Sequence, residues 1–224
     1  MKTVVITGAN RGIGFALCKT YLALGWQVFG VCRKASDELR TSGANVIAGI
    51  DVTNPDAIGR LTQQLREVLS DTGIDLLINN AGILRNESLG NLDSATITEQ
   101  FLVNALAPLQ VTESLLDLLA PAAKIAFITS RMGSIADNSS GGYYGYRMSK
   151  AALNAGAMSL ARDLKARGFA VAILHPGYVQ TAMVNFGGDI SAEVSAQRLS
   201  QRIAELTLET SGGFWHSNGE PLPW

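Results

Sequence analysis

The sequence predicts a single α/β domain, a doubly wound parallel sheet of about seven strands with helices on both faces. Two observations predict this fold. Short apolar runs rich in Val and Ile alternate with longer amphipathic runs, which is the pattern of repeated strand–helix units. The short runs are bounded by Gly, Asn, Asp or Ser, which favour turns at strand ends. Because no linker or internal repeat interrupts this alternation, residues 1–224 are expected to form one domain.

Each short apolar run is expected to form a buried strand, because strands covered on both faces are continuous in apolar residues. In chain order, the first six expected strands are Thr3–Thr7, Gln27–Cys32, Asn45–Gly49, Asp75–Asn79, Lys124–Thr129 and Phe169–Leu174. A seventh strand is expected near the C-terminus, at Gly213–His216.

The amphipathic runs between the strands repeat their apolar residues with the helical period. The expected helices are Gly12–Leu24, Pro55–Ser70, Ile97–Leu119, Tyr146–Arg167 and Ala192–Glu209. The connection Arg33–Ala44 is brief, so any helix within it should be short.

Composition and charge exclude several classes of protein. Apolar residues make up 47% of the 224 residues and charged residues 17%, which is typical of a globular protein and not of a disordered one. The formal net charge of −1 predicts neither nucleic acid nor a membrane surface as a partner. No apolar run reaches the roughly 18 residues of a membrane span, and the N-terminal run is too short for a signal peptide. Cys18 and Cys32 fit no metal or redox motif and indicate core positions in a reducing compartment, so the cytoplasm is expected.

A glycine-rich segment joins the first expected strand to the first expected helix. Its spacing, Gly-x-x-x-Gly-x-Gly from Gly8, lets the backbone turn tightly and approach a ligand closely. The helix that follows offers unpaired N–H groups and a positive dipole end to a pyrophosphate. The sequence therefore predicts a cofactor-binding loop made of Gly8, Asn10, Arg11, Gly12, Ile13 and Gly14.

Short motifs recur where later strands are expected to end, which is the edge where open α/β sheets bind ligands. They are Asp51-Val52, Asn79-Asn80-Ala81-Gly82, Ser130 and Pro176-Gly177, joined by Asn104 within a helix and by Tyr146-x-x-x-Lys150. With the glycine loop, this ordered set resembles the short-chain dehydrogenase/reductase superfamily along nearly the whole chain. Segments 141–150 and 218–224 resemble more specifically its C-factor and Sniffer-type carbonyl reductase branch.

The resemblance implies a Rossmann-type fold and an NAD(P)-dependent enzyme that interconverts a small-molecule carbonyl and an alcohol by hydride transfer. It implies Tyr146 as the general acid/base and Lys150 as a holder of the nicotinamide ribose. It also implies Ser130 as a hydrogen-bond donor to the substrate oxygen and Asn104 as the residue that positions a water in a proton relay. The cofactor is further expected to contact Asp51, Val52, Asn80, Ala81, Gly82, Pro176, Gly177, Val179 and Thr181.

Tyr146 and Lys150 are four residues apart on an expected helix and therefore share a face. Free tyrosine has a pKa of roughly 10, and a nearby ammonium lowers it by about 1–3 units. Lys150 is therefore expected to tune Tyr146 as the catalytic acid. The neighbouring Tyr143 and Tyr144 have no lysine four residues further on.

The catalytic serine has two candidates. The gap from Ser130 to Tyr146 is longer than in most of the superfamily, and Ser134 gives a spacing closer to the common one. Ser130 is favoured because it directly ends an expected strand, where a hydroxyl is held in place. A loop rich in Ser and Gly at Asp137–Gly142 would absorb the difference in length. Ser134 remains the alternative.

The residues after the second expected strand bear on the choice of cofactor. An NAD enzyme usually places an acidic side chain there, against the free 2′-hydroxyl of the adenosine ribose. Here Arg33 and Lys34 follow the strand, and Asp37 and Glu38 come later. Arg33 suits a 2′-phosphate through paired, charge-assisted hydrogen bonds, and Arg11 can approach from the other side. The sequence therefore predicts NADP(H), with NAD(H) less favoured.

A second function and two structural expectations remain open. The resemblance to C-factor permits a dinucleotide-binding signalling or regulatory protein with little turnover, although a pure binding module needs no tuned Tyr146. The segment Gln180–Ser191 is expected to form a flexible lid. Small residues along Tyr146–Arg167 permit close approach of another helix, which predicts a homo-oligomer; the alternative is that they pack on the sheet of the same subunit.

Overall fold

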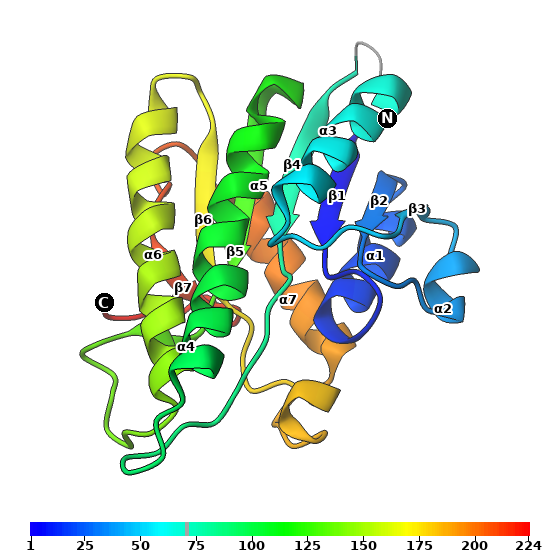
Figure 1. Cartoon of the computed structure of the whole chain (residues 1–224). Coiled ribbons are helices and arrows are strands. Elements are labelled where there is room, and N and C mark those ends of the chain that lie inside the picture. The colour runs from blue at the N-terminus through cyan, green and yellow to red at the C-terminus, as the bar shows by residue number, and fades with distance from the viewer. Residues whose placement is uncertain (70–71) are drawn as a thin grey trace.

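Seven parallel strands form the sheet of the computed structural model, which describes residues 1–69 and 72–224. The strands are β1 Thr3–Thr7, β2 Gln27–Val31, β3 Asn45–Ile47, β4 Ile74–Asn79, β5 Leu119–Ile128, β6 Ala170–His175 and β7 Phe214–His216. Their order is β3-β2-β1-β4-β5-β6-β7, so the chain reverses its direction of winding between β1 and β4. This is the doubly wound arrangement, and the predicted fold class is confirmed (Figure 1).

Helices cover both faces of the sheet. They are α1 Gly12–Ala23, α2 Asp37–Arg40, α3 Pro55–Leu69, α4 Ser94–Phe101, α5 Ala107–Leu115, α6 Tyr144–Lys165 and α7 Ala192–Glu205. On one face α1 packs beside α7, where Leu17 and Leu199 join one apolar cluster (Figure 1). On the other face α3, α5 and α6 bury Leu65, Leu115 and Leu153 in a second cluster. Among the residues described, no helix is long and apolar enough to cross a membrane.

The expected helix Ile97–Leu119 proves to be several pieces. α4 begins earlier, at Ser94, because the Asp93 carboxylate accepts hydrogen bonds from the first N–H groups of the helix. A π-helical segment, Leu102–Leu106, joins α4 to α5. Pro108 explains the interruption, because it lacks the N–H that an α-helix would direct to the carbonyl of residue 104.

Other element ends differ from expectation by a few residues. A 3₁₀ turn ends the α5 region, so β5 begins at Leu119 instead of Lys124. β3 ends at Ile47, two residues before Gly49 turns the chain with a φ of +79°. α6 begins at Tyr144 and α7 ends at Glu205. The end expected for the helix that begins at Pro55, Ser70, lies outside the described residues.

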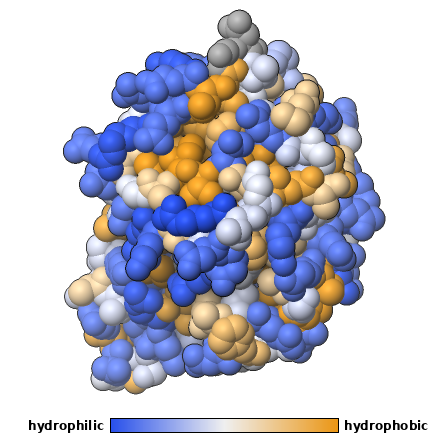
Figure 2. Space-filling model, turned by 90° about the vertical axis from the view of Figure 1, so that its right-hand side faces the viewer, coloured by the Kyte–Doolittle hydropathy of each residue, from blue (hydrophilic) through white to orange (hydrophobic). Residues whose placement is uncertain are grey.

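The sheet ends at β3 on the side of the molecule shown in Figure 2. Hydrophilic side chains cover most of this side, and the largest hydrophobic area lies in its upper half. The first residue of β3, Asn45, is exposed, and its amide donates to the Val28 carbonyl of the neighbouring strand. A strand of three residues is a poor template for pairing with another sheet.

Only some of the small residues of α6 pack against other parts of the same subunit. Ala157 is fully buried, and a Cβ on Gly156 would lie 2.7 Å from a methyl carbon of Leu109 in α5. Ala155, by contrast, is exposed. A homo-oligomer formed through this helix stays a prediction. Light scattering at micromolar concentration is expected to give at least twice the 23.7 kDa of one chain, and a clean monomer would contradict it.

Candidate active site

The predicted motifs meet at one edge of the sheet, where the parallel strands β1, β4, β5 and β6 all end. Gly8 follows β1, Asn80 follows β4, Ser130 comes shortly after β5 and Pro176 follows β6. Because neighbouring strands bring these residues together, motifs that are far apart in the sequence become one site.

The glycine loop is tied to the end of β4. The Asn80 amide donates to the Thr7 carbonyl over 3.0 Å and to the Gly8 carbonyl over 3.3 Å. The Thr7 hydroxyl in turn accepts from the backbone N–H groups of Asn80 and Ala81. Any side chain on Gly14 would overlap the Gly8 carbonyl oxygen. Close packing therefore fixes the loop, and Asn80 belongs to the site as the residue that fixes it.

The N-terminus of α1 suits an anion. Its cap residue, Arg11, makes no side-chain capping bond, and the first turn of α1 holds no acidic residue. A Cβ on Gly12 would lie 3.3 Å from the Thr181 methyl group, so the segment after β6 approaches this helix end. Free N–H groups, a positive helix end and glycines that leave no room for side chains are the features that bind a dinucleotide pyrophosphate. The residues present therefore fit the predicted cofactor.

The expected adenosine end of the site has one acidic side chain, Asp51, and two basic ones, Arg33 and Arg11. The Asp51 carboxylate accepts from the backbone N–H and hydroxyl of Thr53, and these bonds lower its pKa, with a smaller contribution from the charge of Arg33. Val52 beside it is partly buried. Arg33 and Arg11 are exposed, and among the described residues neither lies in an ion pair. Two cations that form no ion pair within the described part of the chain are thus available to a phosphate.

Tyr146 and Lys150 lie in the first turns of α6 and are almost completely buried, with 8% and 4% of their surface exposed. The Lys150 Nζ lies 5.9 Å from the centre of the Tyr146 ring and donates to the Ile128 carbonyl at the end of β5 over 3.0 Å. A Cβ on Gly82 would lie 3.7 Å from this Nζ. The pair therefore reaches the strand ends next to the glycine loop.

Burial shifts the pKa of both groups, in opposite directions. It raises the pKa of Tyr146 to about 12, while the interaction of the phenol with the Ser130 side chain acts the other way. It lowers the pKa of Lys150 to about 8. The expectation of a lowered pKa for Tyr146 is wrong for this structure, because loss of solvation is the largest cause and it raises the pKa. Tyr146 is consequently a protonated phenol at neutral pH.

The two serine candidates have different surroundings. Ser130 interacts with the Tyr146 phenol, and its hydroxyl also accepts from the N–H of Met132 at the start of a short 3₁₀ helix. The Ser134 hydroxyl accepts from the N–H of Asp137 and so holds the following loop. Ser130 therefore lies beside Tyr146, and Ser134 makes a local structural contact; which of them serves as the catalytic serine stays a prediction in favour of Ser130.

The loop between Ser130 and Tyr146 carries the extra length. Gly141 and Gly142 both have positive φ, and the Arg147 guanidinium donates to both of their carbonyl oxygens. The insertion is thus pinned to α6 by an arginine one residue beyond Tyr146.

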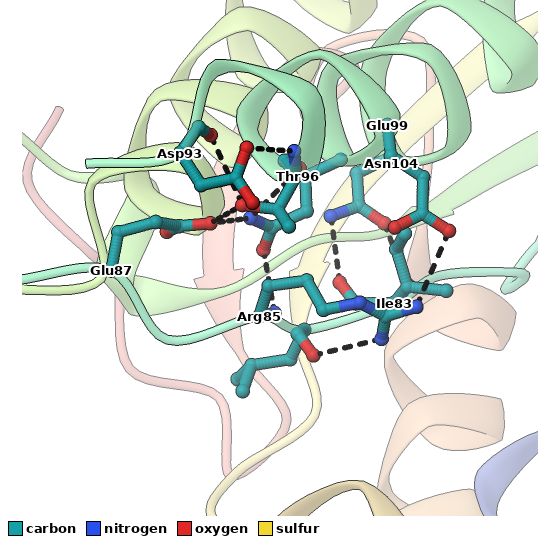
Figure 3. Close-up of polar contacts among 9 residues, drawn as sticks. Ile83, Arg85, Glu87, Asp93, Thr96, Glu99 and Asn104 are labelled. Carbon is teal, nitrogen blue, oxygen red and sulfur yellow. Dashed lines mark hydrogen bonds and ion pairs between the residues drawn. The ribbon is translucent and has the colours of Figure 1, made fainter. Parts of the chain in front are cut away.

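Asn104 lies in the π-helical segment and is fully buried. Its amide exchanges two hydrogen bonds with the backbone of Ile83, each 2.8 Å long (Figure 3). The same amide donates a third bond to the Ser149 hydroxyl. The side chain therefore joins the segment after β4 to α6. A role in a proton relay stays a prediction.

Side chains from later parts of the chain fix the backbone of the segment after β6. The Pro176 carbonyl accepts from the hydroxyls of Ser195 and Ser217, and a Cβ on Gly177 would lie 2.9 Å from a methyl carbon of Ile190. Val179 is buried and pairs with Ile190. Thr181 directly precedes a short 3₁₀ helix, Ala182–Val184, within the expected lid. The mobility of this lid stays a prediction.

Residues 2–189 match the profile of a family described as short chain dehydrogenase. The chain belongs to the short-chain dehydrogenase/reductase family. Among curated members of this family, 1-hydroxy-2-glutathionyl-2-methyl-3-butene dehydrogenase from Rhodococcus sp. (strain AD45) is 37% identical over the whole of both chains. The C-signal protein of Myxococcus xanthus is 44% identical over 154 residues, which cover 67% of this chain and 93% of that protein.

Solved structures of carbonyl reductases in the family superpose over the whole chain. Carbonyl reductase Sniffer of D. melanogaster has a TM-score of 0.93 and 31% identity, covering all of both chains. NADPH-bound carbonyl reductase from chicken fatty liver has a TM-score of 0.93 and 30% identity, covering 100% of this chain and 99% of that one. The predicted family and its branch are confirmed.

Sequence reasoning missed two kinds of residue at this site. Thr7 belongs to the glycine-loop motif, so its place at the end of β1 could have marked it as a residue that fixes Asn80. Glu87 and Gln100 are nearly or completely buried polar residues close to α6. They lie in no motif, and charged or polar residues in such segments are usually exposed, so no sequence signal marked them.

Proposed function

We propose that the chain is an NADP(H)-dependent enzyme that interconverts a small-molecule carbonyl and its alcohol, with Tyr146 as the general acid/base. One observation carries the proposal: a buried, protonated phenol contacts the Ser130 side chain and shares its helix face with Lys150, at the sheet edge where the glycine loop lies. A site that only bound a dinucleotide would not need this group. Residues 1–224 would then be one cofactor-binding and catalytic domain.

The chain offers contacts along the whole length of a dinucleotide. The loop from Gly8 to Gly14 would hold the pyrophosphate at the N-terminus of α1. Asp51 and Val52 would line the adenosine, and Ala81 and Gly82 would lie along the centre. The nicotinamide end would meet Lys150 and the segment formed by Pro176, Gly177, Val179 and Thr181. When bound, the cofactor supplies or accepts the hydride.

In reduction, Tyr146 gives its phenolic proton to the carbonyl oxygen, and the Ser130 hydroxyl donates a hydrogen bond to the same oxygen. Burial keeps the phenol protonated at neutral pH, which is the state this step needs. Lys150 is charged below about pH 8 and then stabilises the phenolate that remains. In oxidation, the same phenolate takes the alcohol proton.

The direct test is oxidation of NADPH by the purified protein with a panel of aldehydes and ketones. Because the Rhodococcus relative is named for a glutathionyl alcohol, a glutathionylated alcohol with NADP⁺ belongs in the panel. Turnover that disappears in Tyr146→Phe is expected. Wild-type protein that binds NADPH but turns over nothing in a broad panel would contradict the proposal and favour a binding protein.

Signalling is the second candidate function, and the similarity to C-signal over two thirds of the chain favours it. A regulator of this kind would bind the dinucleotide as tightly in Tyr146→Phe as in the wild type and would show no turnover that depends on Tyr146. Location in the cytoplasm, inferred from Cys18 and Cys32, stays a prediction.

We expect Arg33 to set the preference for NADPH over NADH. Arg33→Asp removes the charge-assisted bonds to a 2′-phosphate and adds an acceptor for a free hydroxyl, so the ratio of kcat/KM for NADPH to that for NADH should fall by roughly 10- to 100-fold. Arg66→Asp makes the same change in net charge on an exposed part of α3 and is the control. An unchanged ratio in Arg33→Asp would show that Arg33 does not touch the phosphate.

A further inference from the structure

Three polar side chains of one helical stretch hold the segment that leaves β4. Asn104 bonds both backbone groups of Ile83, and the Gln100 amide oxygen accepts from the N–H of Arg85 over 2.8 Å. The Thr96 hydroxyl donates to the Glu87 carboxylate over 2.8 Å (Figure 3). We call this set of contacts the polar ladder.

The spacing of the polar ladder has a simple physical origin. Its helical members are four residues apart, a rise of roughly 6 Å per step. Its partners are two residues apart in the facing segment, and two residues of extended chain span roughly 6.6 Å. The two repeats match, so the segment from Ile83 to Glu87 runs antiparallel to α4 and the π segment with one contact per helical turn.

Glu87 ends the polar ladder and also contacts the catalytic helix. The residue is 2% exposed. One carboxylate oxygen accepts from Thr96 and from the Gln100 amide, and the other accepts from the Gly145 N–H over 3.1 Å. The Glu87 carbonyl accepts from the N–H of Tyr143. Both its backbone and its side chain thus hold the start of α6.

The start of α6 needs this help. Its cap residue, Tyr143, has a left-handed conformation and makes no side-chain capping bond, and the first turn of α6 contains no acidic residue. A buried carboxylate from another segment supplies the acceptor and the negative charge that a helix N-terminus favours. Gly145 also leaves no room for a side chain, since a Cβ there would lie 2.5 Å from the Gln100 amide nitrogen.

The other end of the polar ladder holds the same helix one turn later. The Asn104 amide donates to the Ser149 hydroxyl over 3.0 Å, and that hydroxyl donates to the carbonyl of Tyr146 over 2.8 Å. Tyr146 therefore lies between two attachment points, at Gly145 and at Ser149.

We propose that Glu87 is a positioning residue for Tyr146: its buried carboxylate joins the segment after β4, helix α4 and the first turn of α6, and so fixes the phenol relative to the glycine-loop side of the site. The inference rests on the proposed function, in which Tyr146 is the acid. Catalysis is sensitive to displacements of about 1 Å, so loosening one attachment lowers the rate without removing any reacting group.

Glu87→Gln is the test, because a carboxylate accepts from all three donors and an amide does not. Whichever way the glutamine is turned, its NH₂ group faces a buried donor. The matched control is Glu99→Gln, which removes a carboxylate from the adjacent helix α4, where it forms an exposed ion pair with Arg85. kcat is measured per bound cofactor, so that unfolded protein does not count.

We expect Glu87→Gln to lower this kcat by at least about tenfold with a cofactor Kd close to the wild-type value, and Glu99→Gln to change neither. Amide exchange at Gly145 and its neighbours should become at least about tenfold faster, while exchange in the second half of α6 stays unchanged. A wild-type kcat in Glu87→Gln, or unchanged exchange at the start of α6, would overturn the proposal.

Two further measurements distinguish a failure of this proposal from a failure of the variant to fold and from a failure of the proposed function. If Glu87→Gln does not fold, Thr96→Val removes one bond to the carboxylate and keeps the shape; a smaller fall in kcat with faster exchange at Gly145 is expected, and no change would overturn the proposal. If the wild type has no turnover that depends on Tyr146, the proposed function fails, and the exchange measurement alone decides whether Glu87 fixes the start of α6.

Discussion

Replacing Tyr146 with phenylalanine should lower kcat for carbonyl reduction by roughly a hundred- to ten-thousand-fold, the usual contribution of a general acid. The change removes the hydroxyl that interacts with Ser130 and leaves the ring that packs beside Lys150. The glycine loop and the N-terminus of α1 are untouched, so the Kd for NADPH should stay within a few-fold of the wild-type value. Steady-state rates and fluorescence titration with NADPH measure the two quantities.

Neighbouring tyrosines provide the control for this prediction. Tyr143 and Tyr144 lie in the same segment, and both are more exposed than Tyr146. Tyr144→Phe should therefore keep kcat near the wild-type value. If Tyr146→Phe retained most of its activity, or if Tyr144→Phe lost as much, another group would have to be the acid.

The positions of the main site residues were predictable because they depend on topology. Parallel strands bring their ends to one edge, so Gly8, Asn80, Ser130 and Pro176 had to meet once the strands were recognised. The spacing of four between Tyr146 and Lys150 likewise places both on one helix face. The strand ends and the helical period predict where these residues lie, whereas their roles were implied by the resemblance to the family.

The pKa values of Tyr146 and Lys150 were not predictable from the sequence, because they depend on how deeply the folded chain buries each group. Sequence spacing suggested that Lys150 would lower the pKa of Tyr146, but enclosure of both groups raises one pKa and lowers the other. The polar ladder could not be predicted from the sequence for a related reason. Glu87 lies in a segment without regular structure, and only the packing of α4 against α6 turns it into a buried acceptor.

A buried amine makes Lys150 costly for the fold. Its pKa in the folded protein is about 8, against 10.5 for the free side chain, so between these two values the unfolded chain binds more protons. Stability therefore rises with pH through this window, and below it the folded state carries the full penalty, which is about 3 kcal/mol. The Ile128 carbonyl accepts from this amine, and leaving it unpaired costs roughly 1–2 kcal/mol.

Lys150→Met should consequently be more stable than the wild type at pH 7 and less active. At pH 7 the variant without cofactor is expected to unfold with a free energy about 1–2 kcal/mol above the wild type, since the amine penalty exceeds the cost of the unpaired carbonyl. By pH 10 the wild type has lost most of that penalty, so the order should reverse. Denaturant titrations of both proteins at pH 7 and pH 10 measure the difference.

The same variant should lose both turnover and cofactor affinity, unlike Tyr146→Phe. The proposed mechanism uses Lys150 to stabilise the phenolate and to hold the nicotinamide ribose, so kcat should fall at least about a hundredfold and the Kd for NADPH should rise. In the wild type, kcat/KM for reduction should be constant below about pH 8 and fall above it, as the amine loses its proton. The residual activity of Lys150→Met should lack this fall. A variant that kept it, or bound NADPH as tightly as the wild type, would show that Lys150 serves the fold and not the reaction.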